Sequence, residues 1–466
     1  VIVGAGTGNM LPEKEFDGWR IAVVESDVFG GTCLNRGCIP SKILVYTSDV
    51  AGIIRDAELF GITAELTGTN WPAIRDRVFN RIDPIPARAV AHRRKTGVDV
   101  FTGEARFTAP KVLQVGGDVL RAEHVVLAAG SRPRIPEIAG LAGVPYLTSD
   151  TVMRLDQLPA TMAVLGGGFI AAEMGHVFGG LGTKVTIIAR GERLLARHDS
   201  DISAAFTERY RQDFDLRLNT TVRRVTATAG GVRLDLDTPA GPRQVEAEQL
   251  LVATGRRPNS DTLNLAAAGI DTDEHGHVRT DATMQTKVPG VWALGDLTNH
   301  FQLKHMANAE ARIVWHNIAH PDQPRRAEFP VVPSAVFADP QVASAGVTEQ
   351  ELQASGRPYQ VAARRYGEAA YGWALQDTTS FVKLLADPDT RLLLGVHLIG
   401  PQASTLIQPL VQAMCLGNTV DEVGTGVLYI HPALTEVVEQ ALLALGDKNA
   451  GLVSPLVRLA HPAPED

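Results

Sequence analysis

An α/β fold with three domains is the class that the sequence predicts, and three observations support it. A buried strand that runs into closely spaced glycines occurs twice, at residues 1–8 and 163–168. Strand-like and helical segments alternate over the first two thirds of the chain. From Phe329 onward no such glycine turn recurs, and alternating segments with terminal amphipathic helices indicate an α+β domain.

Composition excludes several classes of protein. The chain has 466 residues, 44 Lys and Arg against 52 Asp and Glu, and a net charge of −8, so it lacks the basic footprint that nucleic acids or anionic membranes require. No apolar run reaches the ~18–20 residues of a membrane span, and the stretch 163–182 contains Glu173 and His176. Three cysteines are too few for a secreted disulfide scaffold, which favours a reducing, cytoplasmic setting.

The first glycine turn has the features of a dinucleotide site. Gly4, Gly6 and Gly8 follow the first strand, and Glu25 ends the next strand, at 21–25. Glycines let a pyrophosphate approach backbone N–H groups at a helix start, and a strand-end acid binds a ribose hydroxyl. Asn9 stands where the third glycine of this fingerprint belongs. The alternative is a tight turn between a strand and a helix, without a ligand.

The next segments lead to a domain boundary. We expect an Arg-rich helical stretch at about 70–95, strands leading to 125–130, and a proline-punctuated loop at 131–147. The second turn, with Gly166 and Gly168, then opens a Rossmann-like unit that resembles the first.

The strand after the second turn ends without an acid. Arg190, Arg193 and Arg197 follow it instead, and arginines in this place favour the 2′-phosphate of NADPH over NADH. A solvated basic turn is the alternative. Two dinucleotide sites in one chain suggest a flavin dinucleotide beside a nicotinamide dinucleotide.

Cys33 and Cys38 are separated by four residues. Two thiols at this spacing can close a small disulfide ring at a helix start, where the helix dipole stabilises a thiolate. No second Cys/His pair follows at ligand spacing, so we expect no metal site. Lys42 lies on the same predicted helix, and Glu173, after the second turn, is a candidate partner for its charge.

These motifs together resemble the pyridine nucleotide–disulfide oxidoreductases of the glutathione reductase-like class, over essentially the whole chain. The resemblance rests on Gly31-Thr32-Cys33-x4-Cys38-Ile-Pro-Ser-Lys42, Gly166-Gly-Gly-Phe169-Ile-Ala-Ala-Glu173, Ala-Thr-Gly255-Arg-Arg-Pro-Asn259, Ala-Leu-Gly295-Asp296 and His431-Pro432-x-x-x-Glu436. Within the family, Leu303-Lys304-His305, Tyr371-Gly372-Trp373 and the C-terminal segment 431–439 are similar to the mycothione reductase branch.

The resemblance implies both cofactors, FAD and NADPH. Beyond the turn residues and arginines above, it implies a second group of cofactor-binding residues, with Phe169 as an aromatic gate on the nicotinamide side: Gly31, Thr32, Lys42, Gly130, Phe169, Gly255, Gly295, Asp296, Gln302, Leu303 and His305. It divides the chain into residues 1–147 and 271–328 for FAD, 148–270 for NADPH, 329–450 for dimerisation, and 451–466 as a flexible tail.

The resemblance also implies the catalytic residues. Cys33 attacks the substrate disulfide, Cys38 lies nearer the flavin as the charge-transfer thiolate, and Lys42 and Glu173 form a charge pair beside it. His431 and Glu436 come from the partner subunit of a homodimer, as acid–base group and orienting carboxylate. We expect the apolar face of 437–442 to belong to that dimer, with the third domain's own core as the alternative.

The predicted substrate is a low-molecular-weight disulfide, mycothione. The alternatives are a dihydrolipoamide dehydrogenase, which prefers NAD and a strand-end acid at Ala189, and a glutathione reductase-type enzyme, which usually carries Thr in place of Ala433. A mercuric reductase needs a further C-terminal cysteine pair, and none follows Cys415. A non-catalytic flavoprotein is a further alternative, which the two cysteines and the His–Glu pair disfavour.

Overall fold

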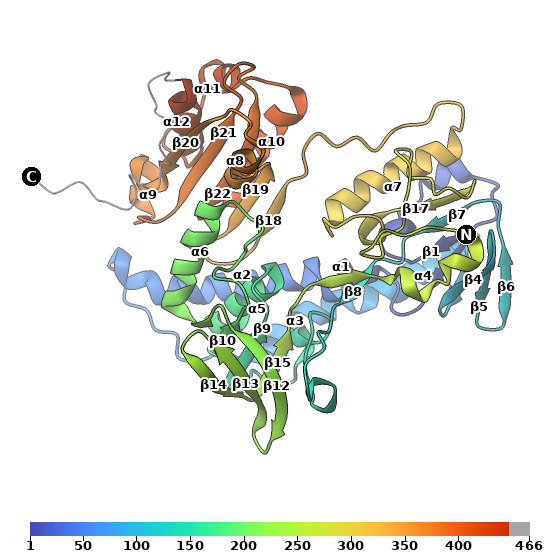
Figure 1. The fold of residues 1–466 in the computed structure, drawn as a ribbon, viewed down its shortest axis with the longest axis horizontal. Helices are drawn as coiled ribbons and strands as arrows, with labels where there is room; N and C mark the ends of the chain where they lie inside the picture. The colour runs from blue at the N-terminus through green and yellow to red at the C-terminus, as the bar shows by residue number, and fades with distance from the viewer. Residues whose placement is uncertain (447–466) are drawn as a thin grey trace, which may run out of the picture.

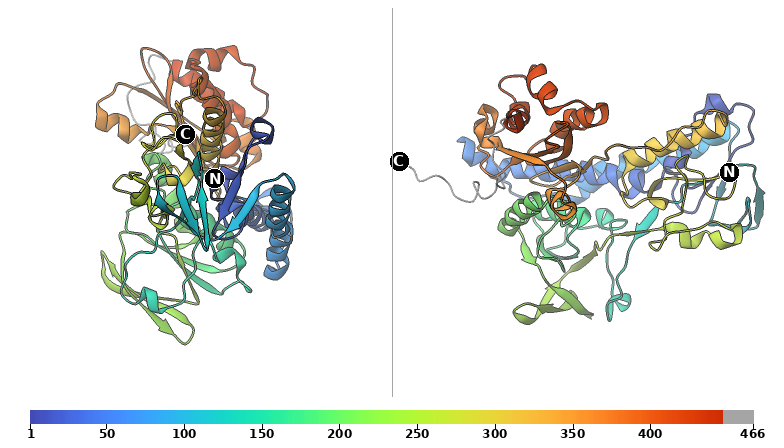
Figure 2. Two further views of the ribbon diagram at one scale, coloured as in Figure 1. Left: turned by 90° about the vertical axis from the view of Figure 1, so that its right-hand side faces the viewer. Right: turned by 45° about the horizontal axis from the view of Figure 1, so that its top comes forward.

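The computed structural model describes residues 1–446, which form three domains. In Figure 1 the first domain lies at the right, the second at the bottom and the third at the upper left, with the long helix α2 (Cys38–Asp56) running across the middle. Figure 2 shows the same helix passing beside all three domains. Among the described residues no helix is long and apolar enough to cross a membrane.

The first domain is built on a parallel sheet of order β17-β7-β1-β2-β3. Its strands are β1 (Ile2–Val3), β2 (Ala22–Glu25), β3 (Asp99–Thr102), β7 (Val125–Leu127) and β17 (Val291–Ala293). One face packs on helix α7 (Lys304–Ala319), and the other packs on a three-stranded antiparallel sheet of β4 (Ala105–Ala109), β5 (Val112–Val115) and β6 (Asp118–Arg121). Because β17 follows the second domain in the chain, the first domain is built from two separate parts of the sequence, with the second domain inserted between them.

The Arg-rich stretch at 70–95 forms two helices rather than one. Helix α3 spans Trp71–Ile82 and α4 spans Pro84–Lys95, with a break at Asp83. Pro84 lacks the N–H that a continuous helix needs, but it is well suited to the first turn of a new helix. Trp71 and Phe79 of α3 are buried and pack toward α2.

The second domain repeats the parallel plan, with sheet order β11-β10-β9-β15. The strands are β9 (Thr161–Leu165), β10 (Lys184–Ile188), β11 (Asp215–Arg217) and β15 (Gln249–Val252), and the helices are α5 (Phe169–Gly180) and α6 (Ser200–Asp213). An antiparallel sheet of β12 (Thr221–Thr228), β13 (Gly231–Thr238) and β14 (Gly241–Ala247) follows. The prediction of a second strand–turn–helix unit is therefore confirmed.

The boundaries of the second domain differ from those predicted. Strand β16 (Arg256–Pro258) already pairs with β8 (Ser131–Pro133), and the carbonyl of Leu263 accepts a hydrogen bond from the N–H of Phe107. The chain thus returns to the first domain at residue 256, not at 271. Likewise Leu141, in the predicted boundary loop, is buried in the core of the second domain. The first boundary still lies within the predicted proline-punctuated loop at 131–147, whereas packing alone sets the second.

The third domain is α+β, as predicted, with an antiparallel sheet of order β18-β19-β22-β21-β20. The strands are β18 (Ser334–Val336), β19 (Val342–Gly346), β20 (Gln360–Arg365), β21 (Phe381–Ala386) and β22 (Leu393–Ile399). The helices are α8 (Glu349–Ser355), α9 (Ala370–Ala374), α10 (Ala403–Leu416), α11 (Val420–Gly426) and α12 (Thr435–Gly446).

The apolar face of α12 corrects one prediction. Val437, Val438, Ala441 and Leu442 are almost fully buried within the single chain, in one cluster with residues of β21 and β22. This face therefore belongs to the third domain's own core rather than to a dimer contact, because a helix covering a sheet must turn its apolar side inward. The predicted tail at 451–466 lies outside the described residues.

A buried ion cluster ties the second domain to the third. The ammonium group of Lys383, in β21, lies 2.8 Å from Asp199, 2.7 Å from Asp201 and 2.5 Å from Glu349. Its side chain is fully buried. The two aspartates begin α6, so the cluster holds this helix and the loop before it against the third domain.

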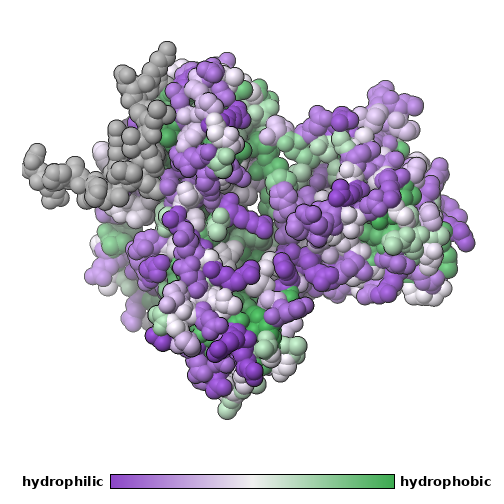
Figure 3. Space-filling view, in the orientation of Figure 1, coloured by the Kyte–Doolittle hydropathy of each residue, from purple (hydrophilic) through white to green (hydrophobic). Residues whose placement is uncertain are grey.

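The face of the molecule in Figure 3 mixes hydrophilic side chains with smaller hydrophobic areas.

Candidate redox and dinucleotide-binding site

The two glycine turns have the same backbone construction. A Cβ atom on Gly4 would lie 2.3 Å from the carbonyl oxygen of Ala128, and one on Gly166 would lie 2.2 Å from that of Ala253. Both glycines have positive φ, +104° and +138°, and both N–H groups donate to a carbonyl of the next parallel strand, at 2.8 and 2.9 Å. Glycine is therefore required at both positions.

The helix expected after the first turn is absent. Two 3₁₀ turns, η1 (Thr7–Asn9) and η2 (Glu13–Phe16), fill the segment, which contains Pro12 and returns to β2 within a short span. Instead, helix α1 (Gly31–Arg36) starts against the turn: a Cβ on Gly31 would lie 2.7 Å from Cα of Gly6. The start of α1 thus provides the helix N-terminus that the sequence placed directly after the glycines.

Asn9, which replaces the third glycine, has a structural role. Its Oδ1 accepts a hydrogen bond from Nε of Arg93 at 2.8 Å, and its carbonyl also binds that guanidinium group. Arg93, in α4, is buried and pairs with Glu13 at 2.6 Å. These bonds fix the end of the turn, so the departure from the fingerprint anchors the loop.

Glu25 lies at the end of β2 and faces the first turn. Its two carboxylate oxygens accept hydrogen bonds from the N–H groups of Ala5 at 2.8 Å and Asp27 at 3.0 Å. These bonds fix the carboxylate beside the glycines, where it retains lone pairs for a ribose hydroxyl.

The arginines after β10 lie beside the second turn. Arg190 and Arg197 are exposed. Arg193 donates to the carbonyl of Ser200 at 3.1 Å and lies 3.5 Å from Glu192. The second turn is thus flanked by cations where the first is flanked by a carboxylate.

Cys33 and Cys38 lie at a break between two helices. Cys33 is in α1 and Cys38 begins α2, with Gly37 between the helices; a Cβ there would lie 2.9 Å from the carbonyl oxygen of Thr32. Both cysteines are free thiols. The Cys33 thiol donates to Cys38, and this hydrogen bond, with the charge of Lys42, lowers the pKa of Cys38 to about 7. The same bond, with burial, raises the pKa of Cys33.

Lys42 and Glu173 are paired, as the sequence suggested. Nζ of Lys42 lies 2.6 and 2.7 Å from the two carboxylate oxygens of Glu173, which is buried. Glu173 also accepts a hydrogen bond from the N–H of Phe337 at 3.1 Å, and Lys42 lies 4.5 Å above the ring of Phe337. The pair joins α2 of the first domain to α5 of the second, next to the thiols.

The remaining predicted cofactor residues surround the same region. Asp296 accepts a hydrogen bond from the hydroxyl of Ser131 at 2.6 Å. The N–H of Gly295 donates to the buried Glu310 at 2.6 Å, and burial raises the pKa of Glu310 to about 7. Sequence reasoning missed Ser131 and Glu310, because neither belongs to a motif; only the fold brings them to this loop.

Further predicted residues have defined places. Gly130 and Gly255 precede the paired connecting strands β8 and β16, both with positive φ. Phe169 starts α5 and is 44% exposed. Gln302 has a φ of +56°, Leu303 is the N-cap of α7, and Nε2 of His305 lies 2.8 Å from the carbonyl of Pro333.

His431 and Glu436 form a pair far from the thiols. Nδ1 of His431 lies 2.7 Å from Oε1 of Glu436, and this hydrogen bond lowers the pKa of that carboxylate. The imidazole side chain is 73% exposed. Figure 1 places α12, and hence Glu436, in the third domain, away from α1, and no hydrogen bond or ion pair joins His431 to either cysteine in residues 1–446.

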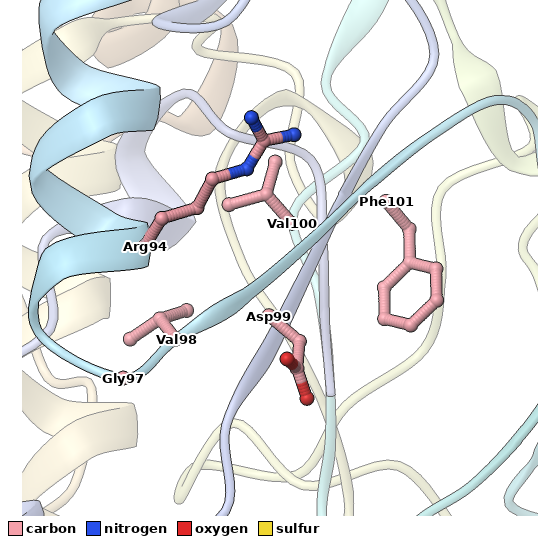
Figure 4. Close-up of a pocket in the computed structure, with 6 residues that line it drawn as sticks. All are labelled: Arg94, Gly97, Val98, Asp99, Val100 and Phe101. Atoms are coloured by element: carbon pink, nitrogen blue, oxygen red, sulfur yellow. The ribbon is translucent and has the colours of Figure 1, made fainter.

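One cavity lies away from this region. It has a volume of about 350 Å³ and is lined by Arg94 and residues 97–101, beside strand β3, and Figure 4 shows an arginine, an aspartate and apolar side chains there. It includes neither cysteine nor glycine turn. No group of three His, Cys, Asp or Glu side chains is arranged for a metal ion in the part of the chain that the structure describes.

Known protein families and relatives match nearly the whole chain. The pyridine nucleotide-disulphide oxidoreductase family matches residues 1–311, and its dimerisation domain matches residues 332–442. A mycothione reductase from Mycobacterium tuberculosis is 43% identical over 95% of this chain and 98% of its own length. A dihydrolipoyl dehydrogenase from Chlamydia trachomatis is 33% identical, over 96% of both chains. Among solved structures, the HOCl-induced flavoprotein disulfide reductase RclA from Escherichia coli superimposes with a TM-score of 0.82 at 25% identity, over 95% of this chain and 98% of its own.

Proposed function

The chain belongs to the pyridine nucleotide-disulphide oxidoreductase family, and from this premise we propose that it reduces mycothione with NADPH, as an FAD-containing disulfide reductase. One observation carries the proposal: a pair of adjacent thiols, one of them favoured as thiolate, lies between helix α1, which starts against the first glycine turn, and the Lys42–Glu173 pair, which reaches α5 after the second turn. The 43% identity to a mycothione reductase supports the substrate. The small number of cysteines, three in the chain, favours a reducing, cytoplasmic setting.

The residues fit both cofactors. In the first turn, no acceptor within the described residues reaches the N–H groups of Gly6, Thr7 and Gly8, and Glu25 is fixed beside them. In the second, a Cβ on Gly168 would meet only open space, at the start of α5. Each turn thus provides donors for a pyrophosphate. FAD, when bound, supplies the two-electron chemistry that links a nicotinamide to a disulfide.

The chain's own residues account for the thiol–disulfide steps. Cys33, once deprotonated, attacks one sulfur of the substrate disulfide, and the S–S bond breaks with release of one thiolate. Cys38 then attacks Cys33, releases the second thiol and closes the Cys33–Cys38 disulfide. The pKa of about 7 suits Cys38 as the resolving thiolate. Lys42 holds positive charge beside it, and Glu173 orients Lys42.

A proton must reach the leaving thiolate, and His431 of the partner subunit is the proposed donor. Glu436 fixes the imidazole by its hydrogen bond to Nδ1, which leaves Nε2 for the reaction. Because this exposed pair lies away from the cysteines of its own chain, a site complete in all four residues requires a homodimer with two shared sites.

Substrate identity is tested by turnover of the FAD-loaded enzyme with NADPH. We expect mycothiol disulfide to give a kcat/KM at least tenfold above that for glutathione disulfide or lipoamide. A preference for lipoamide with NADH would instead identify a dihydrolipoamide dehydrogenase, the alternative that the 33% identical relative represents.

The shared site is tested by mixing two inactive variants. Cys33→Ser and His431→Ala chains, after subunit exchange, form heterodimers in which one of the two sites is intact. Random exchange should recover about a quarter of the wild-type activity, by statistical assembly under twofold symmetry. Exchange that is confirmed by mass but recovers no activity would contradict the role of the partner's His431.

A further inference from the structure

We propose that Gln350 of the third domain is a positioning residue for the arginine loop, residues 190–199, and thereby contributes to the preference for NADPH over NADH. This inference rests on the proposed function and adds to it a residue from outside the two dinucleotide-binding units. Gln350 belongs to none of the sequence motifs, and its role follows from the place of helix α8 in the fold.

The arginine loop joins β10 to α6 and is held at both of its neighbours. At the second glycine turn, the N–H of Leu195 donates to the carbonyl of Gly167 at 2.8 Å. A Cβ on Gly167 would lie 3.4 Å from the side chain of Leu194, so the loop packs directly on the turn. At the other end, α6 extends from the second domain toward the third (Figure 1), and the end of the loop meets the third domain there.

Gln350 binds the main chain at this end of the loop. It is the second residue of α8, and its Nε2 donates to the carbonyl of His198 at 2.9 Å. Its Oε1 accepts a hydrogen bond from the N–H of Ser200 at 3.1 Å. The amide group thus spans Asp199 and uses both its donor and its acceptor, which fixes the direction of the chain on the two sides of that residue.

The contacts around Gln350 bind side chains of the loop end. Oδ2 of Asp199 accepts from the N–H of Glu349 at 3.0 Å, while Oδ1 binds Lys383 at 2.8 Å. Nδ1 of His198 lies 3.1 Å from Oγ of Ser344, in β19. These bonds hold the loop end against α8. Among them, those of Gln350 act on the main chain itself, so they decide how the preceding residues leave the contact.

Two short paths lead from Gln350 to the arginines. Nη1 of Arg193 donates at 3.1 Å to the carbonyl of Ser200, the residue whose N–H Gln350 binds. Arg197 directly precedes His198, whose carbonyl Gln350 binds. A guanidinium group binds a phosphate through a fork of N–H donors and must be held in a defined place to do so. NADH has no 2′-phosphate, so a displaced loop should weaken the binding of the phosphorylated coenzyme alone.

The test compares the two oxidised coenzymes. Gln350→Ala removes both bonds and keeps a good helix former. By calorimetry on the FAD-loaded enzyme, we expect the Kd for NADP⁺ to rise about fivefold, the equivalent of one hydrogen bond, and the Kd for NAD⁺ to stay unchanged. Hydrogen exchange of the backbone N–H groups in 190–200, followed by peptide mass, should become faster. Ser344→Ala, which releases only the His198 side chain, should give a smaller rise in the Kd for NADP⁺.

Gln353→Ala, on the same helix, is the matched control. Nε2 of Gln353 donates to the hydroxyl of Tyr359 at 3.1 Å rather than to the loop, so both Kd values should stay unchanged. A Kd for NADP⁺ equal to that of the parent would overturn the proposal. An equal rise for NAD⁺ would also overturn it, because it would indicate a general loosening of the domain. A parent enzyme without a preference for NADP⁺ would instead contradict the proposed coenzyme, so the two failures are distinct.

Discussion

The two glycine turns share a construction and differ in charge. Gly4 and Gly166 are closed by the same backbone contact, to Ala128 and Ala253. One strand later, the first unit has Glu25, fixed by turn N–H groups, and the second has exposed arginines. Under the proposed function, backbone sterics create a place for a dinucleotide at each turn, and a few side chains at the next strand end select which dinucleotide binds.

The turns also differ in the segment that each one leads into. The second runs directly into α5, whereas the first runs into short 3₁₀ turns and uses the start of α1 instead. Because α1 carries Cys33, the first unit brings the glycine turn proposed for a pyrophosphate close to the thiol proposed to attack the substrate. The helix of the second unit starts at Phe169 and carries no cysteine. The two units therefore share the backbone of the turn and differ in the side chains beside it.

The largest effect is expected from adding a methyl group to each turn glycine. Gly4→Ala and Gly166→Ala each place a Cβ within 2.3 Å of a carbonyl oxygen at positive φ, which costs more than about 3 kcal/mol locally. Gly4→Ala should yield protein without flavin absorbance. Gly166→Ala should retain flavin but lose reduction by NADPH. Gly230→Ala, where a Cβ meets nothing, is the control; if both turn variants lost flavin equally, the turns would not be functionally separate.

The charge contrast is tested at Arg190. Loss of a charge-assisted bond to a phosphate, worth about 1.5–3 kcal/mol, should raise KM for NADPH roughly tenfold or more in Arg190→Ala, with NADH kinetics nearly unchanged. Arg243→Ala, on β14 of the same domain, should change neither. A parent enzyme with equal kcat/KM for both coenzymes would remove the distinction between the turns.

A bridge between the two units is tested at Glu173. In Glu173→Gln the charge of Lys42 is no longer opposed, so the pKa of Cys38 should fall below its value of about 7, and the thiolate should persist to lower pH. Lys42→Met should move this pKa upward. Both shifts are measured by the pH dependence of the long-wavelength thiolate–flavin absorbance. If the pKa of Cys38 shifted in the same direction in both variants, the assignment of Lys42 and Glu173 as opposing charges on Cys38 would be contradicted.

The smallest effect is expected at Glu25. In Glu25→Gln the amide keeps one acceptor oxygen but turns its NH₂ group toward one of the two N–H donors. Loss of one hydrogen bond, about 1 kcal/mol, should weaken FAD retention about fivefold, measured by flavin release on dilution. Asp17→Asn, exposed after η2, is the control. An unchanged rate of release would mean that Glu25 only orders the turn.

Much of the site was predictable, because it is written in local motifs. The glycines, Cys33, Cys38 and the strand-end charges follow from the requirements of a turn, a thiol pair or a phosphate at short spacing. The pairing of Lys42 with Glu173 was predictable only as a candidate, since the two lie on different domains. Ser131 and Glu310 reach the site from positions without a local signature.

The sequence by itself determined the repeated α/β plan, the α+β third domain and the close spacing of the two thiols, because backbone sterics and residue spacing act over a few residues. Only the tertiary structure decided that α1 replaces the missing helix, that the face of α12 lies in its own core, and that the second domain ends at residue 256. Those outcomes depend on which distant surfaces pack together. Burial free energy is a property of the whole fold and is not encoded at any one position.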